Sequence, residues 1–154
     1  MKDVLLIEDD NVERQIICHA LESFGEINPL TLAASAEALD FLSREGEGTD
    51  SQSPQLPVLI ILDLHLGGSN GLALLKQLKG LPIIRRIPVI GVCTPFSQEI
   101  VNQAYDLNIN CAIARRVQAD DFSSSMQALL HFWLNINHPP VLTLHPSGKS
   151  LTEP

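Results

Sequence analysis

Short apolar stretches alternate along the chain with longer segments in which apolar residues recur at helical spacing. The apolar stretches cover residues 4–7, 29–33, 58–62, 88–92 and 111–114. The helical segments begin near residues 11, 35, 70, 97 and 120, and the last runs to about residue 136. Short apolar runs bounded by polar or turn residues predict strands, whereas the helical spacing predicts amphipathic helices. This strict alternation predicts βαβ units and a parallel sheet.

Polar residues at the starts of the helical segments predict how the first two helices begin. Asn11 is a good capping residue for the first helix. Ser35 is expected to cap the second helix, and Ala36, Leu39 and Leu42 are expected to lie on its buried side.

The pattern predicts an α/β fold, a doubly wound sheet of five parallel strands with five helices. In the common order 2-1-3-4-5 the first and third strands are neighbours, and ligands bind beyond the carboxyl ends of the strands. We expect residues 1–138 to form this single domain. Residues 139–154 begin with two prolines and show no helical pattern, so we expect a flexible C-terminal tail.

The net charge, the lack of long apolar runs and the cysteine content restrict the possible partners and the location of the protein. The 154 residues carry a formal net charge of −8, which disfavours binding to nucleic acid or to an anionic membrane. No apolar run approaches membrane-spanning length, and the start of the chain does not resemble a signal peptide, so we expect a cytoplasmic protein. Cys18, Cys93 and Cys111 are scattered and odd in number, which predicts reduced thiols.

Acidic residues follow the first and third predicted strands. Glu8 and Asp9 come directly after the first strand, and Asp63 follows the third. Any one of these acids is more readily explained as a helix cap or a solvated side chain. Together they are predicted to converge at the sheet edge, where a hard divalent ion such as Mg²⁺ would relieve their repulsion. Asp63 is the best placed to attack a phosphorus atom, and Thr94, after the fourth strand, could bond a phosphoryl oxygen.

Four segments together resemble the response-regulator receiver family, whose fold is flavodoxin-like. They are VLLIEDD, LIILDLHLGGSNGLALLKQLK, RIPVIGVCT and AYDLNINCAIARRVQADDF, and they occur in the family's order across residues 1–138. The resemblance implies a two-component response regulator that receives a phosphoryl group from a sensor histidine kinase and signals through altered protein contacts.

The resemblance also implies roles for individual residues. Asp63 would be the phospho-acceptor, and Thr94 the hydroxyl that senses phosphorylation. Asp9, Asp63 and the backbone carbonyl of His65 would hold Mg²⁺, with Glu8 acting through a water. Asp10, one place beyond the acidic pair, is better explained as an exposed acid at a helix start.

The segment after the fifth predicted strand departs from the family pattern. Receivers carry a lysine there that pairs with the phosphoryl group, followed by a proline after a cis bond, whereas this chain has Arg115 and Arg116. Arginine is a planar fork and does not replace lysine conservatively. A cis bond before a non-proline residue costs about 2.5–4 kcal/mol, so we expect a trans bond and a rearranged loop, which could move Arg115 out of the site. The family's aromatic switch position falls on Ala112.

The loop after the second helix, RRIPV and the ending HFWLNINHPP are similar to those of small stand-alone receivers that partner bacterial and cyanobacterial phytochrome histidine kinases. This similarity implies a phytochrome as the kinase and a homodimer to which Phe132 and Trp133 contribute. Packing of both aromatic residues on the domain's own core explains them equally well.

Two other classes of function compete with a phosphorylated switch. Arg115, Arg116 and Ala112 leave open a degenerate pseudo-receiver that binds partners without phosphorylation. An enzyme is not expected, because an aspartyl phosphohydrolase would carry a second acid where His65 stands. The glycines after the third strand lack the pattern of a nucleotide-binding loop, and no pair of DNA-binding helices follows the receiver segment.

Overall fold

The computed structural model describes residues 1–47, 55–68, 70–115 and 119–142. Its strands are β1 (Lys2–Ile7), β2 (Ile27–Leu32), β3 (Leu59–Asp63), β4 (Val89–Cys93) and β5 (Cys111–Ala114). Its α-helices are α1 (Asn11–Glu22), α2 (Ser35–Glu47), α3 (Asn70–Gly80), α4 (Gln98–Asp106) and α5 (Ala119–His131). Two 3₁₀ turns (Leu66–Gly68 and Ile84–Arg86) and a π-helical segment (Phe132–Ile136) complete the described elements.

The five strands form one parallel sheet in the order β2-β1-β3-β4-β5, which confirms the predicted topology. β3 lies at the centre and is buried along its whole length, because helices cover both faces of the sheet. The strands are paired so that their carboxyl ends share one edge. Leu62 pairs with Ile7, and Asp63 pairs with Val92, so β1 and β4 end on either side of Asp63.

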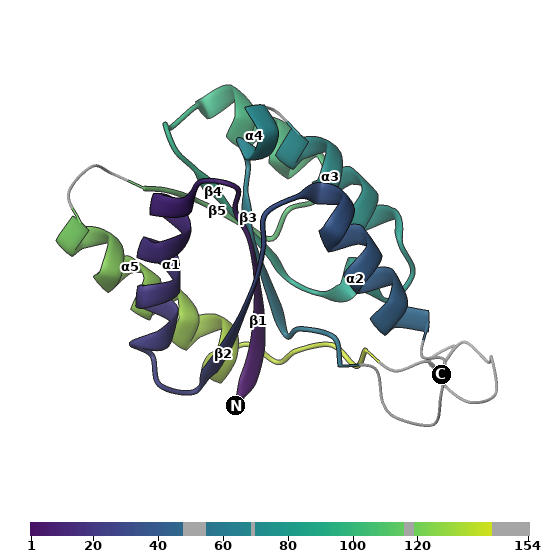
Figure 1. Ribbon diagram of the computed structural model, residues 1–154, viewed down its shortest axis with the longest axis horizontal. Coiled ribbons are helices and arrows are strands. Elements are labelled where there is room, and N and C mark those ends of the chain that lie inside the picture. Colours follow the sequence, from purple (N-terminus) through teal and green to yellow (C-terminus); the bar gives the residue numbers. More distant parts are fainter. Residues whose placement is uncertain (48–54, 69, 116–118, 143–154) are drawn as a thin grey trace.

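Alternate residues of each strand enter two separate cores. On one face, Leu5, Ile7, Ile60 and Leu62 pack under α2, α3 and α4. On the other face, Val4, Leu6, Leu59 and Ile61 pack under α1 and α5. Figure 1 shows α1 and α5 together on one side of the sheet and α2 and α3 on the other. Successive side chains of a strand point to opposite faces of the sheet, so each residue at a strand end also belongs to one of the two faces.

The helix starts agree with the sequence in part. α4 begins near residue 97 as expected, and Ser97 caps it, since its hydroxyl accepts a hydrogen bond from the backbone N–H of Ile100. The cap of α1 is Asp10 and not Asn11, because Asp10 has extended backbone angles and its carboxylate accepts from the N–H groups of Val12 and Glu13.

The buried stripe of α2 agrees with the prediction in part. Leu42 is buried as predicted, and Leu39 is half-buried against the same core. Ala36 is exposed, and Ala38, four residues before Leu42, is buried instead. None of the helices in the described ranges combines the length and the apolar character that crossing a bilayer requires.

The last helix continues as a π-helical segment beside the start of the chain. Trp133 packs against the core under α1 and α5, whereas Phe132 is 47% exposed. Their rings meet edge to face, with centroids 5.3 Å apart. Lys2 Nζ donates to the carbonyl of Leu134 at 2.6 Å and ties the start of β1 to this segment. Residues 139–142 contain no helix or strand, and the rest of the predicted tail lies outside the described residues.

Candidate metal centre

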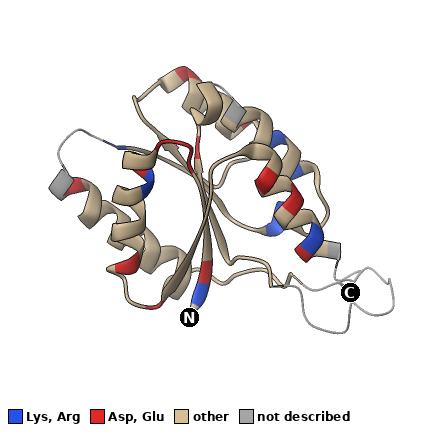
Figure 2. Cartoon of the chain, viewed as in Figure 1, with Lys and Arg blue, Asp and Glu red and all other residues tan. Residues whose placement is uncertain are grey.

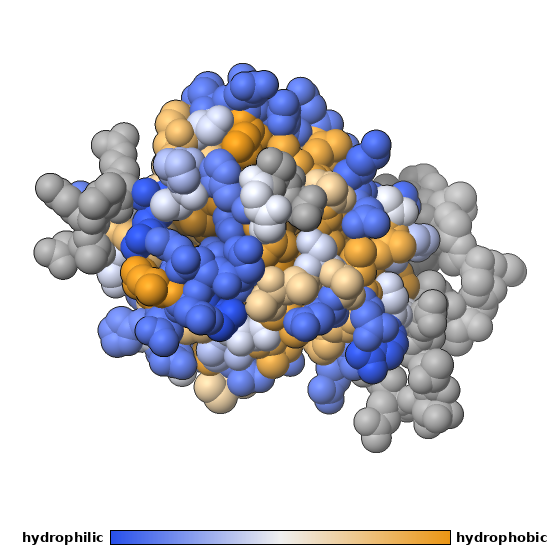
Figure 3. Space-filling view, turned by 45° about the horizontal axis from the view of Figure 1, so that its top comes forward, coloured by the Kyte–Doolittle hydropathy of each residue, from blue (hydrophilic) through white to orange (hydrophobic). Residues whose placement is uncertain are grey.

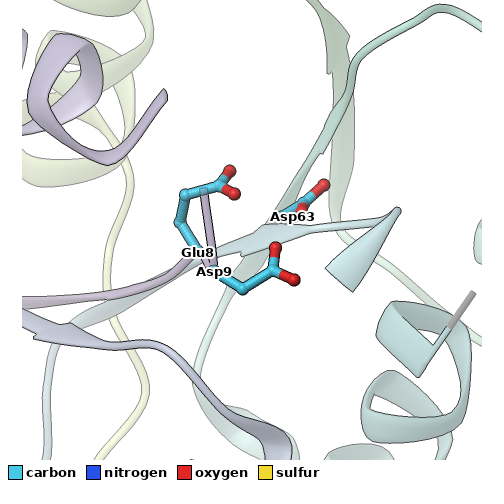
Figure 4. A group of neighbouring side chains, drawn as sticks. All are labelled: Glu8, Asp9 and Asp63. Atoms are coloured by element: carbon cyan, nitrogen blue, oxygen red, sulfur yellow. The ribbon is translucent and has the colours of Figure 1, made fainter. Parts of the chain in front are cut away.

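Three carboxylates from two neighbouring strands meet at the carboxyl edge of the sheet. Glu8 and Asp9 follow β1, and Asp63 is the last residue of β3. One oxygen from each carboxylate lies within 4.8 Å of the others. Figure 2 shows the acidic segment after β1 beside the end of β3, and Figure 4 shows the three side chains gathered around one space. Residues more than fifty positions apart are therefore brought together as the topology predicts.

Backbone groups hold each of these acids in place. The N–H of His65 donates to Asp63 Oδ1 at 2.9 Å, and the N–H of Asp10 donates to Glu8 Oε1 at 3.0 Å. The N–H of Gly67 donates to Asp9 Oδ2 at 3.1 Å across the site. Gly67 has a φ of 55°, a left-handed conformation that glycine adopts without strain. The loop after β3 therefore orients Asp9 as well as Asp63.

Burial makes this cluster of acids electrostatically unusual. Glu8 is 3% exposed and Asp63 8% exposed, whereas Asp9 is exposed. Burial raises the pKa of Glu8 to about 8, and the negative charges of Asp63 and Asp9 add to the rise. Burial also raises the pKa of Asp63, although the hydrogen bond from His65 opposes that rise. At neutral pH the metal-free cluster thus keeps a proton, held mainly by Glu8.

The donor set fits a hard divalent cation. All three side chains offer oxygen, which Mg²⁺ and similar ions prefer, and no thiol or imidazole nitrogen belongs to the described cluster. A cation would replace the proton that now reduces the repulsion between the acids.

A cavity of about 300 Å³ opens above the three acids. It is lined by Glu8, Asp9, Asp10, Glu13, Asp63, His65, Val92 and Thr94. Figure 3, which turns this edge of the sheet forward, shows hydrophilic and apolar side chains mixed on the visible face. The hydroxyl oxygen of Thr94 is buried, and no described residue forms a hydrogen bond with it. An unpaired buried hydroxyl is costly, so Thr94 has the capacity to bond a ligand in the cavity.

His65 contributes to the site through its backbone. Its ring Nε2 lies 2.9 Å from the carbonyl oxygen of Pro95 and 3.6 Å from Cys93 Sγ. The ring nitrogen therefore has its hydrogen-bond partners on the α4 side of the site. Its carbonyl accepts the N–H of Gly68 at 2.9 Å and retains a second lone pair. The three cysteines are free, as the sequence predicts.

Arg115 lies beside the site but does not pair with Asp63 in the described part of the chain. Its guanidinium forms an ion pair with Glu13 on α1 and lies 6.0 Å from the centre of the Phe122 ring on α5. Arg115 Nε is buried, and none of the described residues forms a hydrogen bond with it. Arg115 is thus paired with Glu13, whereas Arg116 and the bond before it, on which the predicted rearrangement depends, lie outside the described residues.

The sequence alone did not identify Asp10 and Glu13 as lining residues. Asp10 caps α1, and Glu13 belongs to its first turn. The signal was present in the topology, because the helix after β1 must begin at the same edge as the acids.

Comparison with known proteins agrees with this geometry. The family profile described as "Response regulator receiver domain" matches residues 4–127. Response regulator Rcp1 of Synechocystis sp. is 30% identical over 134 residues, which cover 86% of this chain and 89% of Rcp1. The crystal structure of the phosphorylated cyanobacterial phytochrome response regulator RcpA is similar, with a TM-score of 0.78 and 29% identity, over 91% of this chain and 99% of RcpA. The Mn(2+)-bound form of Rcp1 has a TM-score of 0.77 and 28% identity, over 92% and 100%.

Proposed function

The chain belongs to the response-regulator receiver family, and from this premise we propose that Asp63 accepts a phosphoryl group from a sensor histidine kinase. The observation that carries the proposal is the cluster of Glu8, Asp9 and Asp63, whose oxygens lie within 4.8 Å of one another at the mouth of a cavity. A reactive carboxylate and the acids that would hold a cation beside it are the two elements that transfer to aspartate requires.

The residues fit a metal site that we assign to Mg²⁺. Asp9, Asp63 and the carbonyl of His65 would hold the ion, and Glu8 would act through a water. When bound, the divalent cation neutralises charge on the oxygens of the transferring phosphoryl group. The existence of a Mn(2+)-bound form of the relative Rcp1 supports the binding of a divalent cation.

Asp63 and Thr94 have different roles in the phosphoryl transfer. One oxygen of Asp63 accepts the N–H of His65, which orients the carboxylate and leaves the other oxygen to attack. The new O–P bond forms as the P–N bond of the kinase's phosphohistidine breaks, and the leaving imidazole takes up a proton. The hydroxyl of Thr94 then donates to a phosphoryl oxygen and gains the partner that it lacks in the unmodified protein.

The kinase and the output are proposed from the relatives. A phytochrome is the kinase that the relative RcpA suggests by its description. We propose output through protein contacts and not through turnover of a substrate or binding of nucleic acid. Phe132, Ile136 and Val141 are exposed apolar residues near the described C-terminal end, and they favour a homodimer through this region. Cytoplasmic location and a flexible tail over residues 139–154 remain predictions.

One observation favours the second candidate, a pseudo-receiver that binds partners without phosphorylation. Arg115, which stands where the family has its phosphate-binding lysine, is paired with Glu13 and not with the acidic cluster. If that pair never opens, the phosphoryl group would lack a cationic partner.

Phosphorylation with a small donor tests the proposal directly. Incubation with acetyl phosphate and Mg²⁺ is expected to increase the intact mass by one phosphoryl group in the wild type and in Asp40→Asn, whose exposed acid lies on α2 away from the site. Asp63→Asn should remain unmodified. Failure of the wild type to gain mass would favour the pseudo-receiver, and equal modification of Asp63→Asn would exclude Asp63 as the acceptor.

A further inference from the structure

The ion pair between Arg115 and Glu13 links the end of β5 to the first turn of α1. Both side chains are partly buried, with 17% and 21% of their surfaces exposed. The guanidinium also lies over Phe122 of α5. The pair is therefore shielded from solvent more than an ordinary surface ion pair, and it holds together three elements on one face of the sheet.

The alternation of side chains places this pair on the same face as the candidate acceptor. Asp63 follows Ile61 by two positions, and Ile61 packs under α1 and α5. Arg115 likewise follows Ile113 by two positions, and Ile113 packs against the same core. Asp63 and Arg115 are thus directed to the face covered by α1 and α5.

Glu13 itself lines the cavity that contains Asp63 and Thr94. The cavity lining contains five carboxylates and neither lysine nor arginine, so an anion on Asp63 would find no cation in the described wall. Arg14 is nearby, but it is bound to the carbonyl of Glu8 at 3.2 Å and to the side chain of Asn11. Arg115 differs in that its Nε is buried and has no hydrogen-bond partner among the described residues.

We propose that Glu13 competes with the phosphoryl group for Arg115. In the unmodified protein Glu13 holds the guanidinium, and phosphorylation of Asp63 transfers it to the phosphoryl oxygens, which match its planar fork. The exchange breaks the link between α1 and β5. This inference rests on the proposed function and adds Glu13 as a positioning residue that acts through Arg115.

The exchange would give this domain an output that Ala112 cannot provide. A methyl group has no alternative orientation, whereas Arg115 would exchange one anionic partner, Glu13, for another, the phosphoryl group on Asp63. Loss of Glu13 and of the Phe122 contact would alter the surface formed by α1 and α5, which Figure 1 shows side by side. Phosphorylation is therefore expected to be sensed on the α1 and α5 face.

Beryllofluoride, a phosphoryl analogue, allows the competition to be measured without turnover. With Mg²⁺ present, Glu13→Gln is expected to bind beryllofluoride about fivefold more tightly than the wild type, the effect of removing one partly buried ion pair. Arg115→Gln should weaken binding and abolish the gain when combined with Glu13→Gln. Asp10→Asn is the matched control, because it removes one charge from the same cavity but does not contact Arg115.

A second readout follows the arginine itself. In ¹⁵N-labelled wild type the Nε–H resonance of Arg115 is expected to shift on addition of beryllofluoride, and Glu13→Gln should show part of this shift beforehand. With a purely structural pair, beryllofluoride would leave the Arg115 resonance of the wild type in place, and Glu13→Gln would change only the urea midpoint.

The outcomes separate the inference from the proposed function. Equal affinity of wild type and Glu13→Gln, or the same gain in Asp10→Asn or in the Arg115→Gln background, overturns the competition while leaving phosphorylation of Asp63 intact. Binding by Glu13→Gln but not by the wild type supports it. Absence of binding in both overturns the inference and the proposed function together.

Discussion

The proton held by Glu8 predicts an unusual dependence of stability on pH. In the unfolded chain this carboxyl has an ordinary pKa of 4.5, and burial raises it to about 8 in the folded protein. Because the pKa is higher in the folded state, the folded state binds more protons between these two values. The associated stability is fully present below pH 4.5 and is lost as pH rises through about 8. The metal-free protein should therefore become less stable as the acids ionise.

The size of the effect follows from the rise in pKa. From 4.5 to about 8, at about 1.4 kcal/mol per pH unit, the upper limit is about 5 kcal/mol. The charges of Asp63 and Asp9 contribute to that rise. Local relaxation and water penetration lower the real cost of ionising a buried group. We therefore expect about 2 kcal/mol, which corresponds to a decrease in melting temperature of about 4–8 °C for a domain of this size.

The assay compares wild type with Glu8→Gln in EDTA between pH 4 and 9, because other titrating groups cancel in the difference. The substituted amide retains a carbonyl oxygen for the N–H of Asp10. The wild type should match Glu8→Gln at pH 4 and become less stable than it towards pH 9. Excess Mg²⁺ at pH 8 should remove this deficit, since a cation replaces the proton. The control is Glu37→Gln, an exposed acid in the first turn of α2, and its difference from wild type should stay constant.

Two results would refute this reasoning. A difference between wild type and Glu8→Gln that does not change with pH would show that Glu8 is ionised without cost in the folded protein. A wild type that gains stability relative to Glu8→Gln as pH rises would reverse the sign, and the acids would then be stabilised by a group other than a proton or a metal ion.

Three further predictions follow from contacts around the site. Gly71→Ala should lower the free energy of unfolding in urea by about 2 kcal/mol and weaken Mg²⁺ binding, because the added Cβ would clash with the carbonyl of Asp63. The control Gly91→Ala should lower it less, because its Cβ would meet only the flexible ends of side chains. Asp10→Ala should lower the free energy of unfolding by about 1 kcal/mol through loss of the α1 cap, whereas Asp10→Asn should leave it nearly unchanged. Equal urea midpoints for the two variants would contradict the assigned cap. Thr94→Val should stabilise the unmodified protein by about 1 kcal/mol while weakening beryllofluoride binding, and a loss of stability would show that the hydroxyl has a partner after all.

The topology and the meeting of the acids could be predicted from the sequence because both depend on short-range pattern. Apolar runs of strand length indicated the five strands, and the parallel arrangement then required the ends of β1 and β3 to share an edge. The convergence of Glu8, Asp9 and Asp63 followed without any knowledge of side-chain packing. Only the neighbouring strand order had to be assumed from the commonest arrangement.

The errors have different physical origins. Asp10 and Asn11 are both good caps, and only the backbone angles of the folded chain decide between them. On α2, Ala36 and Ala38 differ by about 200° around the helix axis, so the buried stripe depends on how the helix rotates against the sheet. The partner of Arg115 lies 102 positions away on α1, and it is one of several acids at that helix start. No local pattern specifies this choice.

The two separate cores make the position of the acceptor depend on the count of residues along β3. Successive residues of that strand enter opposite cores, so a single inserted or deleted residue would exchange Ile61 and Leu62 between layers and turn Asp63 towards α3. The carboxylate would then no longer lie next to Asp9, even if the strand kept its hydrogen bonds. Relatives that keep this chemistry at the position of Asp63 should therefore vary in length only outside the central strand.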